Sequence, residues 1–153
     1  MWQAEKINYT HMKQIVLVTA AVVICSIFCN ACSKQAGSSQ PLESKWMVTE
    51  MPGFTKEELI KVNAHIDLSN PENSTGSLDC NHLFWKTTIK NNGTIAFSQV
   101  NYTYKYCEGQ MAMESKFVEI APSITSYKLE GHFLYLYDKQ GKQLIKAINP
   151  AWD

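Results

Sequence analysis

Apolar and polar residues alternate along much of the chain after residue 44, a period of two that is typical of strands with one buried face. The alternation is clearest over residues 60–68, where the pattern predicts a half-buried strand. Thr55 and Glu58 have the spacing of a capping box, so we expect a helical turn just before that strand. Residues 69–76 are polar and rich in turn-forming types, which predicts a loop.

Asn91-Asn92-Gly93 separates two β-rich runs, residues 83–90 and 94–100. Asn-Gly between such runs predicts a hairpin, because both residues accept a positive φ. β-favouring residues continue from Tyr102 to Cys107. Three further strands are predicted near the carboxyl end, with a turn at Asp138–Gly141 before the last of them: residues 126–130, 133–137 and 143–148.

The period changes between these strands. Met113, Phe117, Ile120 and Ala121 fall at i, i+4, i+7 and i+8, which places one apolar stripe on a helix spanning about residues 110–121. Pro122 would end that helix. Together the elements predict an α+β protein: a single small domain with a curved antiparallel β-sheet of hairpins packed on one amphipathic helix.

The amino-terminal region has the pattern of a targeting segment. Lys13 is followed by an apolar run over residues 15–29, and small Ala31 precedes Cys32. This is typical of a secretory signal peptide, and the run is shorter than the roughly 20 residues of a membrane span. We therefore expect a signal peptide over residues 1–31, of which 1–11 would be an extension ahead of a start at Met12. A retained anchor helix is the alternative reading.

Cys32 stands where lipoproteins carry their lipid-modified cysteine, and the following residues, to about 43, are polar enough to form a flexible tether. Acyl chains on Cys32 would hold the protein on a membrane, because each buried methylene contributes about 0.8 kcal/mol. Ser33, rather than Asp, follows Cys32, and this resembles sorted lipoproteins that are held at the outer membrane. The alternative is a periplasmic or secreted protein with unmodified Cys32. In both readings the folded domain is expected to span residues 44–153.

Charge narrows the range of partners. The chain holds 14 basic and 14 acidic residues, and all the basic ones are lysine. A chain with balanced charge and no arginine argues against nucleic-acid binding, which depends on dense basic patches that neutralise phosphates. No pattern in the sequence indicates a cofactor.

The order of elements, with the residues at their joints, resembles the META domain of the HslJ-like bacterial envelope lipoproteins over Ser44 to Ile148. The matching positions are a tryptophan in the first strand, a Cys-Asn followed by aromatics, a threonine four residues before a cysteine, a helix with a glutamate three residues before an aromatic, and a closing Tyr-Gly-Leu-Leu-Asp-Gly series: Trp46, Cys80, Asn81, Phe84, Trp85, Thr103, Cys107, Glu114, Phe117, Tyr127, Gly131, Leu134, Leu136, Asp138 and Gly141. Asp79 departs from the family's usual glycine before the cysteine.

The resemblance implies an envelope-anchored lipoprotein linked to heat or envelope stress through protein contacts, with no established enzymatic activity. The expected partners are the membrane, through the lipid anchor, and an envelope protein that the sequence does not name. A secreted or periplasmic binding module or inhibitor, using exposed aromatic strand residues, is the alternative function.

Cysteine and histidine supply the remaining candidate chemistry. Besides Cys32, the exported part would contain only Cys80 and Cys107, and in an oxidising compartment such a pair favours a disulfide. Two buried thiols, or reactive use of them, are the alternatives. His65, Cys80 and His82 could in principle bind a metal, or Cys80 could act as a nucleophile with His82 as its base. Their spacing matches no recognised motif, so we expect no metal and no catalytic residue.

Two groups of side chains are candidates for contacts with a partner. Tyr102, Tyr104, Tyr135 and Tyr137 lie in predicted strands, where alternate residues face outward, and they could form a surface for a glycan, peptide or protein. The methionines beside Phe117 could form an adaptable surface, but such a helix stripe is more often core.

Overall fold

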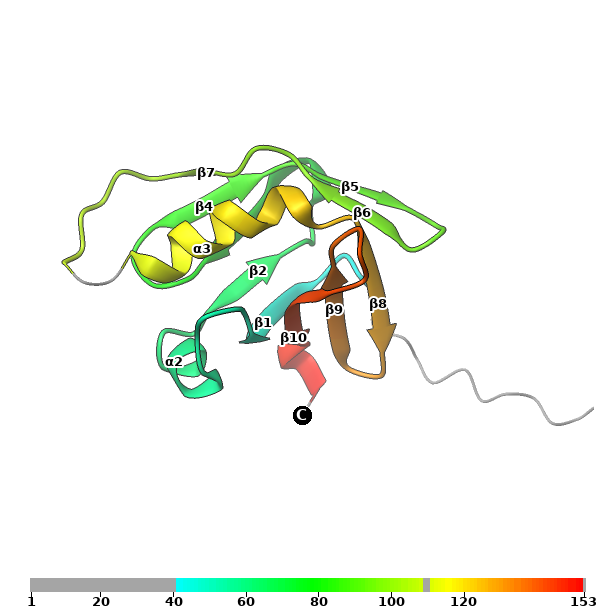
Figure 1. The fold of residues 1–153 in the computed structure, drawn as a ribbon, viewed down its shortest axis with the longest axis horizontal. Helices are drawn as coiled ribbons and strands as arrows, with labels where there is room; N and C mark the ends of the chain where they lie inside the picture. The colour runs from blue at the N-terminus through cyan, green and yellow to red at the C-terminus, as the bar shows by residue number, and fades with distance from the viewer. Residues whose placement is uncertain (1–40, 109–110, 153) are drawn as a thin grey trace, which may run out of the picture. The chain divides into compact units, whose positions relative to one another are not determined.

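The computed structural model describes residues 41–108 and 111–152, and these contain a ten-stranded sheet in which all neighbours are antiparallel (Figure 1). The strands are β1 (Lys45–Glu50), β2 (His65–Asp67), β3 (Ser74–Ser77), β4 (His82–Trp85), β5 (Thr87–Lys90), β6 (Thr94–Phe97), β7 (Asn101–Tyr102), β8 (Ser126–Glu130), β9 (Phe133–Tyr137) and β10 (Gln143–Ile148). The helices are α2 (Lys56–Lys61) and α3 (Ala112–Ile120), with 3-10 turns at Pro71–Asn73, Ala121–Ser123 and Pro150–Trp152.

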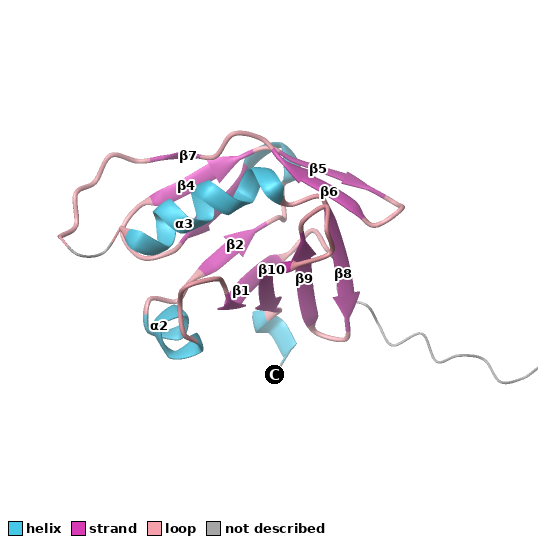
Figure 2. Ribbon diagram, viewed as in Figure 1, coloured by secondary structure: helices cyan, strands magenta, loops and turns pink. Residues whose placement is uncertain are grey.

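The strand order is β5-β6-β8-β9-β10-β1-β2-β3-β4-β7, so the first and last strands of the domain pair in its middle. The sheet curves, and α3 lies across one face of it (Figure 2). The predicted single domain, with a curled antiparallel sheet and one packed helix, is therefore confirmed. The leader, the modification of Cys32 and most of the predicted tether fall outside the described residues.

The face of the sheet under α3 holds the core. Phe117 of α3 is fully buried, with its ring centroid 5.3 Å from that of Trp85 on β4. Met113, Ile120 and Ala121 are buried beside it, as the helical stripe predicted. Burying Phe117, Met113 and Ile120 contributes about 1.5–3 kcal/mol each, which offsets the low intrinsic stability of a nine-residue helix.

The predicted capping box is present at the start of α2. The Thr55 hydroxyl accepts the Glu58 N–H at 3.2 Å, and the Glu58 carboxylate accepts the Thr55 backbone N–H at 2.7 Å. This backbone hydrogen bond, together with one from the Thr55 hydroxyl, holds the pKa of Glu58 below its usual range. The cap stabilises the first turn of a helix too short to persist alone.

The strand predicted over residues 60–68 is wrong in its first half. Residues 60 and 61 belong to α2, which buries Leu59 and leaves Ile60 55% exposed. The helix ends at Lys61, and Asn63, with a φ of 51°, turns the chain toward β2 at His65. The alternation of apolar and polar residues suggested a strand because α2 is only six residues long and buries a single side chain. A helix with one buried residue shows no helical period in the sequence.

The loop predicted over residues 69–76 is also partly wrong, because β3 begins at Ser74 and pairs with both β2 and β4. Its inward positions hold Ser74 and Gly76, so the strand lacks an apolar signal. At Gly76 a Cβ atom would lie 3.0 Å from the carbonyl oxygen of His65 and 3.3 Å from the ring of Trp85. The tight fit of Trp85 over this backbone favours glycine.

The Asn-Gly hairpin is confirmed as β5 and β6, with Gly93 at a φ of 83°. Its first strand is shorter than predicted, because residues 82–85 form the separate strand β4, which pairs with β3 and β7. The strand expected to reach Cys107 likewise ends at Tyr102. The three carboxyl-terminal strands, β8, β9 and β10, have the predicted bounds. Within the described part of the chain, no helix is long and apolar enough to span a membrane.

Candidate functional site

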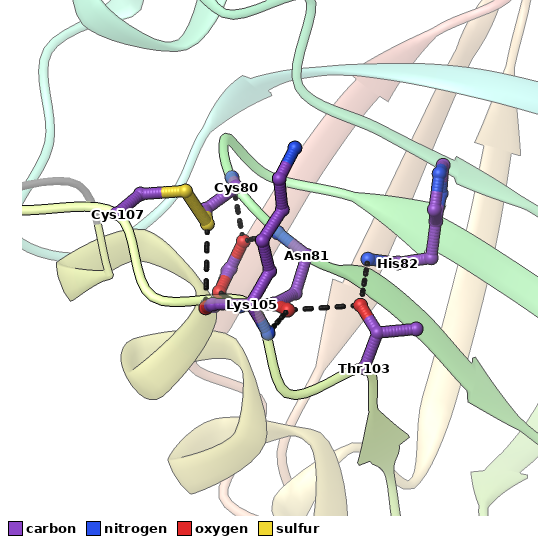
Figure 3. The surroundings of a disulfide bond; sticks show 7 residues. Cys80, Asn81, His82, Thr103, Lys105 and Cys107 are labelled. Atoms are coloured by element: carbon purple, nitrogen blue, oxygen red, sulfur yellow. Dashed lines mark hydrogen bonds between the residues drawn. A yellow bond between two sulfur atoms is a disulfide. The ribbon is translucent and has the colours of Figure 1, made fainter.

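A disulfide joins two segments that lie far apart in the sequence (Figure 3). Cys80, in the turn before β4, is bonded to Cys107, at the end of the segment that follows β7, and their Cα atoms are 6.1 Å apart. We call residues 103–107 the arm. The disulfide fastens the far end of the arm to the sheet, whereas β7 fastens its near end through pairing with β4.

Glu114, in the first turn of α3, holds the turn before β4 from the other side. Its side chain is only 3% exposed. One carboxyl oxygen accepts the backbone N–H of Cys80 at 2.7 Å and also that of Asn81, and the other accepts the Asn81 side-chain amide at 2.9 Å. Glu114 thereby satisfies the backbone N–H groups of Cys80 and Asn81, which removes the cost of leaving them unpaired away from water.

Asn81 connects this turn to the arm, as Figure 3 shows. Its Oδ1 accepts the Thr103 hydroxyl and the Lys105 backbone N–H, each at 2.8 Å, and its Nδ2 donates to the Lys105 carbonyl at 3.1 Å. The amide thus takes the place of a strand neighbour for the arm. We name Cys80, Asn81, Thr103, Cys107 and Glu114 together the clamp, because every member restrains the arm or the turn that holds it.

The clamp contains no free thiol, since both cysteines are in the disulfide. The Cys80 sulfur lies 3.5 Å from the Lys105 carbonyl oxygen, but a disulfide sulfur carries no proton, so this is a contact rather than a hydrogen bond. The turn at Asp79 has a φ of 146°, a backbone conformation that favours glycine. The aspartate therefore occupies the backbone geometry of the glycine that the family usually carries there.

The histidines do not complete a site with Cys80. His65 on β2 and His82 on β4 are both in register with Ser77, so they lie on the same face of the sheet with β3 between them. The Nδ1 atom of His65 is 2.8 Å from the Asn63 carbonyl oxygen. Within residues 41–108 and 111–152, no three His, Cys, Asp or Glu side chains are grouped as metal ligands would be.

The four candidate tyrosines lie in two separate places. Tyr102 and Tyr104 sit at the β7 edge, with ring centroids 5.7 Å apart, and are 39% and 97% exposed. Tyr135 and Tyr137 are stacked on β9, where both are half-buried, and in the sheet order β9 and β7 are separated by β10, β1, β2, β3 and β4. They therefore do not form one surface. Tyr106, two residues beyond Tyr104, is 82% exposed.

The β9 tyrosines have a cationic neighbour. The Nζ atom of Lys146 lies 5.6 Å from the ring centroid of Tyr135 and 5.0 Å from that of Phe133. A hydrogen bond from Lys146 to Glu50, 3.1 Å long, holds the pKa of the lysine above its usual range. Beside it, a groove of about 530 Å³ lies between α2 and strands β1 and β10. The local contacts of Lys146 are already satisfied, which favours a structural role.

Sequence reasoning recognised all five members of the clamp as positions of a family pattern, but only the disulfide was predicted as an interaction. The hydrogen bonds of Asn81 and Glu114 were missed. One feature of the sequence could have indicated these bonds. Asn81, Thr103 and Glu114 are polar residues at fixed places in the pattern, although no catalytic or metal-binding role requires a polar residue there.

Comparisons with known proteins agree with this fold. A crystal structure of a DUF4847 family protein from Bacteroides vulgatus is similar, with a TM-score of 0.53 and 14% sequence identity, over 72% of this chain and 95% of that one. At this identity the likeness shows the fold alone. No curated protein matches the sequence. The family model described as the META domain, which is not a known enzyme family, matches residues 40–149, and the chain therefore belongs to the META domain family.

Proposed function

We propose that the chain is an exported, non-enzymatic envelope lipoprotein. Residues 1–31 are removed as a signal peptide, residues 32–43 form a tether from lipid-modified Cys32, and residues 44–153 are the META domain. The lipid anchor holds the domain at a membrane, which we propose is the outer membrane. There the domain contacts another envelope protein under heat or envelope stress. The leader pattern and the chemistry of the clamp are the two features of this chain that support the assignment beyond its family membership.

The disulfide between Cys80 and Cys107 is the observation that carries the proposal. Disulfides persist in oxidising compartments and are rare in the cytosol, where thiols are kept reduced. This disulfide can fasten the arm to the sheet only in a compartment where it is not reduced. It therefore supports the export that the apolar leader predicts.

The polar groups of the clamp support a role in contacts rather than in catalysis. Asn81 and Glu114 are buried, and their side-chain oxygens already accept hydrogen bonds from the chain itself. A cysteine nucleophile needs a free thiolate and an adjacent base, whereas Cys80 is bonded to Cys107. The clamp instead presents the arm in one conformation, which reduces the ordering cost of a protein contact.

Fractionation of cells that express the full chain tests the anchor. We expect the wild type in the membrane fraction, and mass spectrometry should find an acylated Cys32 as the first residue of the mature protein. Cys32→Ala should leave the membrane fraction, whereas Cys25→Ala, inside the leader, should not change the location. Intact protein in the cytosol, with its amino terminus retained, would contradict the proposal. Loss of survival under heat or envelope stress on deletion, restored by the wild type but not by Cys32→Ala, would support the stress link.

A secreted or periplasmic binding module is the second candidate, and the exposure of the Tyr104 and Tyr106 rings favours it. Exposed tyrosines bury large areas at low entropic cost when a partner covers them. The mature amino terminus discriminates the two candidates, because this one requires an unacylated Cys32 in a soluble fraction.

A further inference from the structure

The sheet has an open edge at β7 and the arm. β7 is the last strand of the sheet order, and among the described strands it pairs only with β4. The opposite edge is more protected, because the 3-10 turn at Pro71–Asn73 packs near β5, and the Glu72 side chain of that turn pairs with Lys86. An open strand edge presents unpaired backbone groups that can accept another strand.

The direction of the backbone groups follows from the pairing of β7 with β4. Leu83 and Tyr102 are opposite each other, and the N–H of Thr103 donates to the His82 carbonyl at 3.1 Å. This makes Leu83 and Tyr102 a non-hydrogen-bonded pair, so the N–H and C=O of Tyr102 point away from β4. The Lys105 N–H and C=O also point inward, to Asn81.

The same alternation directs the backbone groups of Tyr104 and Tyr106 outward. Among the described residues, no group hydrogen-bonds to the backbone of either tyrosine. Three tyrosines therefore present main-chain donors and acceptors at a spacing of two, on a segment that the clamp restrains through Thr103, Lys105 and Cys107. Figure 1 shows β7 beside β4 and the segment that follows it continuing past the start of β4.

Aromatic surface accompanies the open backbone. The rings of Tyr104 and Tyr106 are 97% and 82% exposed. A pocket of about 200 Å³ adjoins the edge, lined by Tyr102 and by α3 side chains that include Val118, with Met111 at the start of the helix. An added strand would place its side chains beside Tyr102 and this pocket, which combines main-chain hydrogen bonds with an apolar contact.

We propose that this edge binds the same edge of a second copy of the chain, forming a two-fold symmetric dimer through antiparallel pairing centred on Tyr104. In this register Tyr104 faces Tyr104 of the second copy, and Tyr102 faces Tyr106. The two edges form about six main-chain hydrogen bonds. The sheets of the two copies become continuous. The proposal does not depend on the lipid anchor.

The sequence of the arm supports a second copy as the occupant. The Tyr104-centred register pairs every outward tyrosine with another tyrosine, and aromatic cross-strand pairs stabilise antiparallel strands. It also places Lys105 opposite Thr103, so that no like charges face each other across the two strands. A two-fold contact uses both open edges and leaves none for further growth.

The test compares the full chain and its variants in mild detergent by sedimentation equilibrium. Tyr104→Pro removes an outward N–H that has no described partner within the chain, so the domain should keep its fold and its disulfide. Because of the symmetry it deletes two hydrogen bonds of the dimer, and we expect at least about 30-fold weaker association. Phe84→Ala is the matched control: it removes a 45% exposed aromatic from β4, on the opposite face to the Tyr102 ring, and should leave association unchanged.

A cysteine at the two-fold axis tests the register. Facing residues of a hydrogen-bonded antiparallel pair have Cα atoms about 5.5 Å apart, within the range of a disulfide. Tyr104→Cys should therefore form a disulfide-linked dimer on mild oxidation, with the native Cys80–Cys107 bond retained in the peptide map, whereas Phe84→Cys should not.

Concentration-dependent dimers that Tyr104→Pro disrupts and Phe84→Ala preserves would support the proposal. A wild type that stays monomeric up to about 1 mM would overturn it. Association that Tyr104→Pro leaves intact would also overturn it, because the contact would then lie elsewhere, for example in the leader. Pairing of the edge with a different extended protein, in a chain that does not self-associate, would overturn the choice of occupant.

Discussion

Replacement of Glu114 by glutamine tests whether the clamp has the hydrogen-bond pattern described. One carboxyl oxygen holds the backbone N–H groups of Cys80 and Asn81, so the single oxygen of a glutamine must remain there. The glutamine NH₂ then faces the Asn81 Nδ2 at the site of a 2.9 Å hydrogen bond. Asn81 has no freedom to flip, because its Oδ1 already accepts from Thr103 and Lys105.

The expected cost follows from these contacts. The variant loses one hydrogen bond, about 1 kcal/mol, and leaves two buried donors facing each other, about 1–3 kcal/mol more. We therefore expect the free energy of unfolding to fall by about 3 kcal/mol. For a domain of this size, such a loss lowers the melting temperature by about 12 °C.

Urea unfolding of the oxidised protein, followed by the fluorescence of buried Trp46 and Trp85, measures this loss. Glu119→Gln is the control: that glutamate is 66% exposed on the same helix, and its ion pair with Lys116 should contribute less than about 0.5 kcal/mol. A Glu114→Gln variant within about 0.5 kcal/mol of the wild type would refute the assigned hydrogen bonds.

A second substitution makes the test more specific. Asn81→Asp alone brings two carboxyl groups together and should destabilise the domain strongly. In the double variant with Glu114→Gln, a carboxylate oxygen of the introduced aspartate can accept from the glutamine NH₂. The double variant should therefore be more stable than Asn81→Asp alone, with a coupling of about 1 kcal/mol or more. Additive losses would show that the two side chains do not meet.

Three further outcomes follow from the structure. Replacing Cys80 and Cys107 together by alanine should lower the unfolding free energy by about 3.5 kcal/mol in urea, since the bond closes a sequence separation of 27; an unchanged midpoint would contradict this. Asp79→Gly should raise stability by about 1 kcal/mol, because glycine adopts a φ of 146° without strain, and a destabilised variant would count against that backbone. The lowered pKa of Glu58 means that its carboxylate stabilises the fold above its ordinary pKa and loses that effect as pH falls through the lowered value. The stabilities of the wild type and Glu58→Gln should therefore converge as the pH falls below the lowered pKa of Glu58. Thr55→Ala should raise the Glu58 pKa part of the way in an NMR titration, because its hydroxyl bond is lost and its N–H bond is kept.

The successes and failures of sequence reasoning have a common physical basis. The hairpin at Gly93, the stripe through Phe117 and the cap at Thr55 depend on interactions between near neighbours, and each is visible as a local pattern. β3 was missed because its inward positions are Ser74 and Gly76, which carry no apolar signal. Only the ring of Trp85, packed against that glycine, explains why a strand without large side chains is buried there.

The candidate site divides in the same way. Cys80 and Cys107 were paired from cysteine count and compartment alone, whereas the hydrogen bonds of Asn81 and Glu114 join residues 33 positions apart and needed the fold to bring them together. Exposure of Tyr104 and partial burial of Tyr135 on its inner strand likewise depend on where each strand stands in the sheet, which no local pattern reports.

By itself, the sequence determined the α+β class, the bounds of the three carboxyl-terminal strands, the helix that covers the sheet and the membership of the META domain family. Only the tertiary structure decided that β7 is an edge strand, that the clamp restrains the arm beside this edge, and that the candidate tyrosines lie in two separate places. The reason is that periodicity and capping arise from contacts within a few residues, whereas strand order and the satisfaction of buried polar groups are settled by partners far away in the chain.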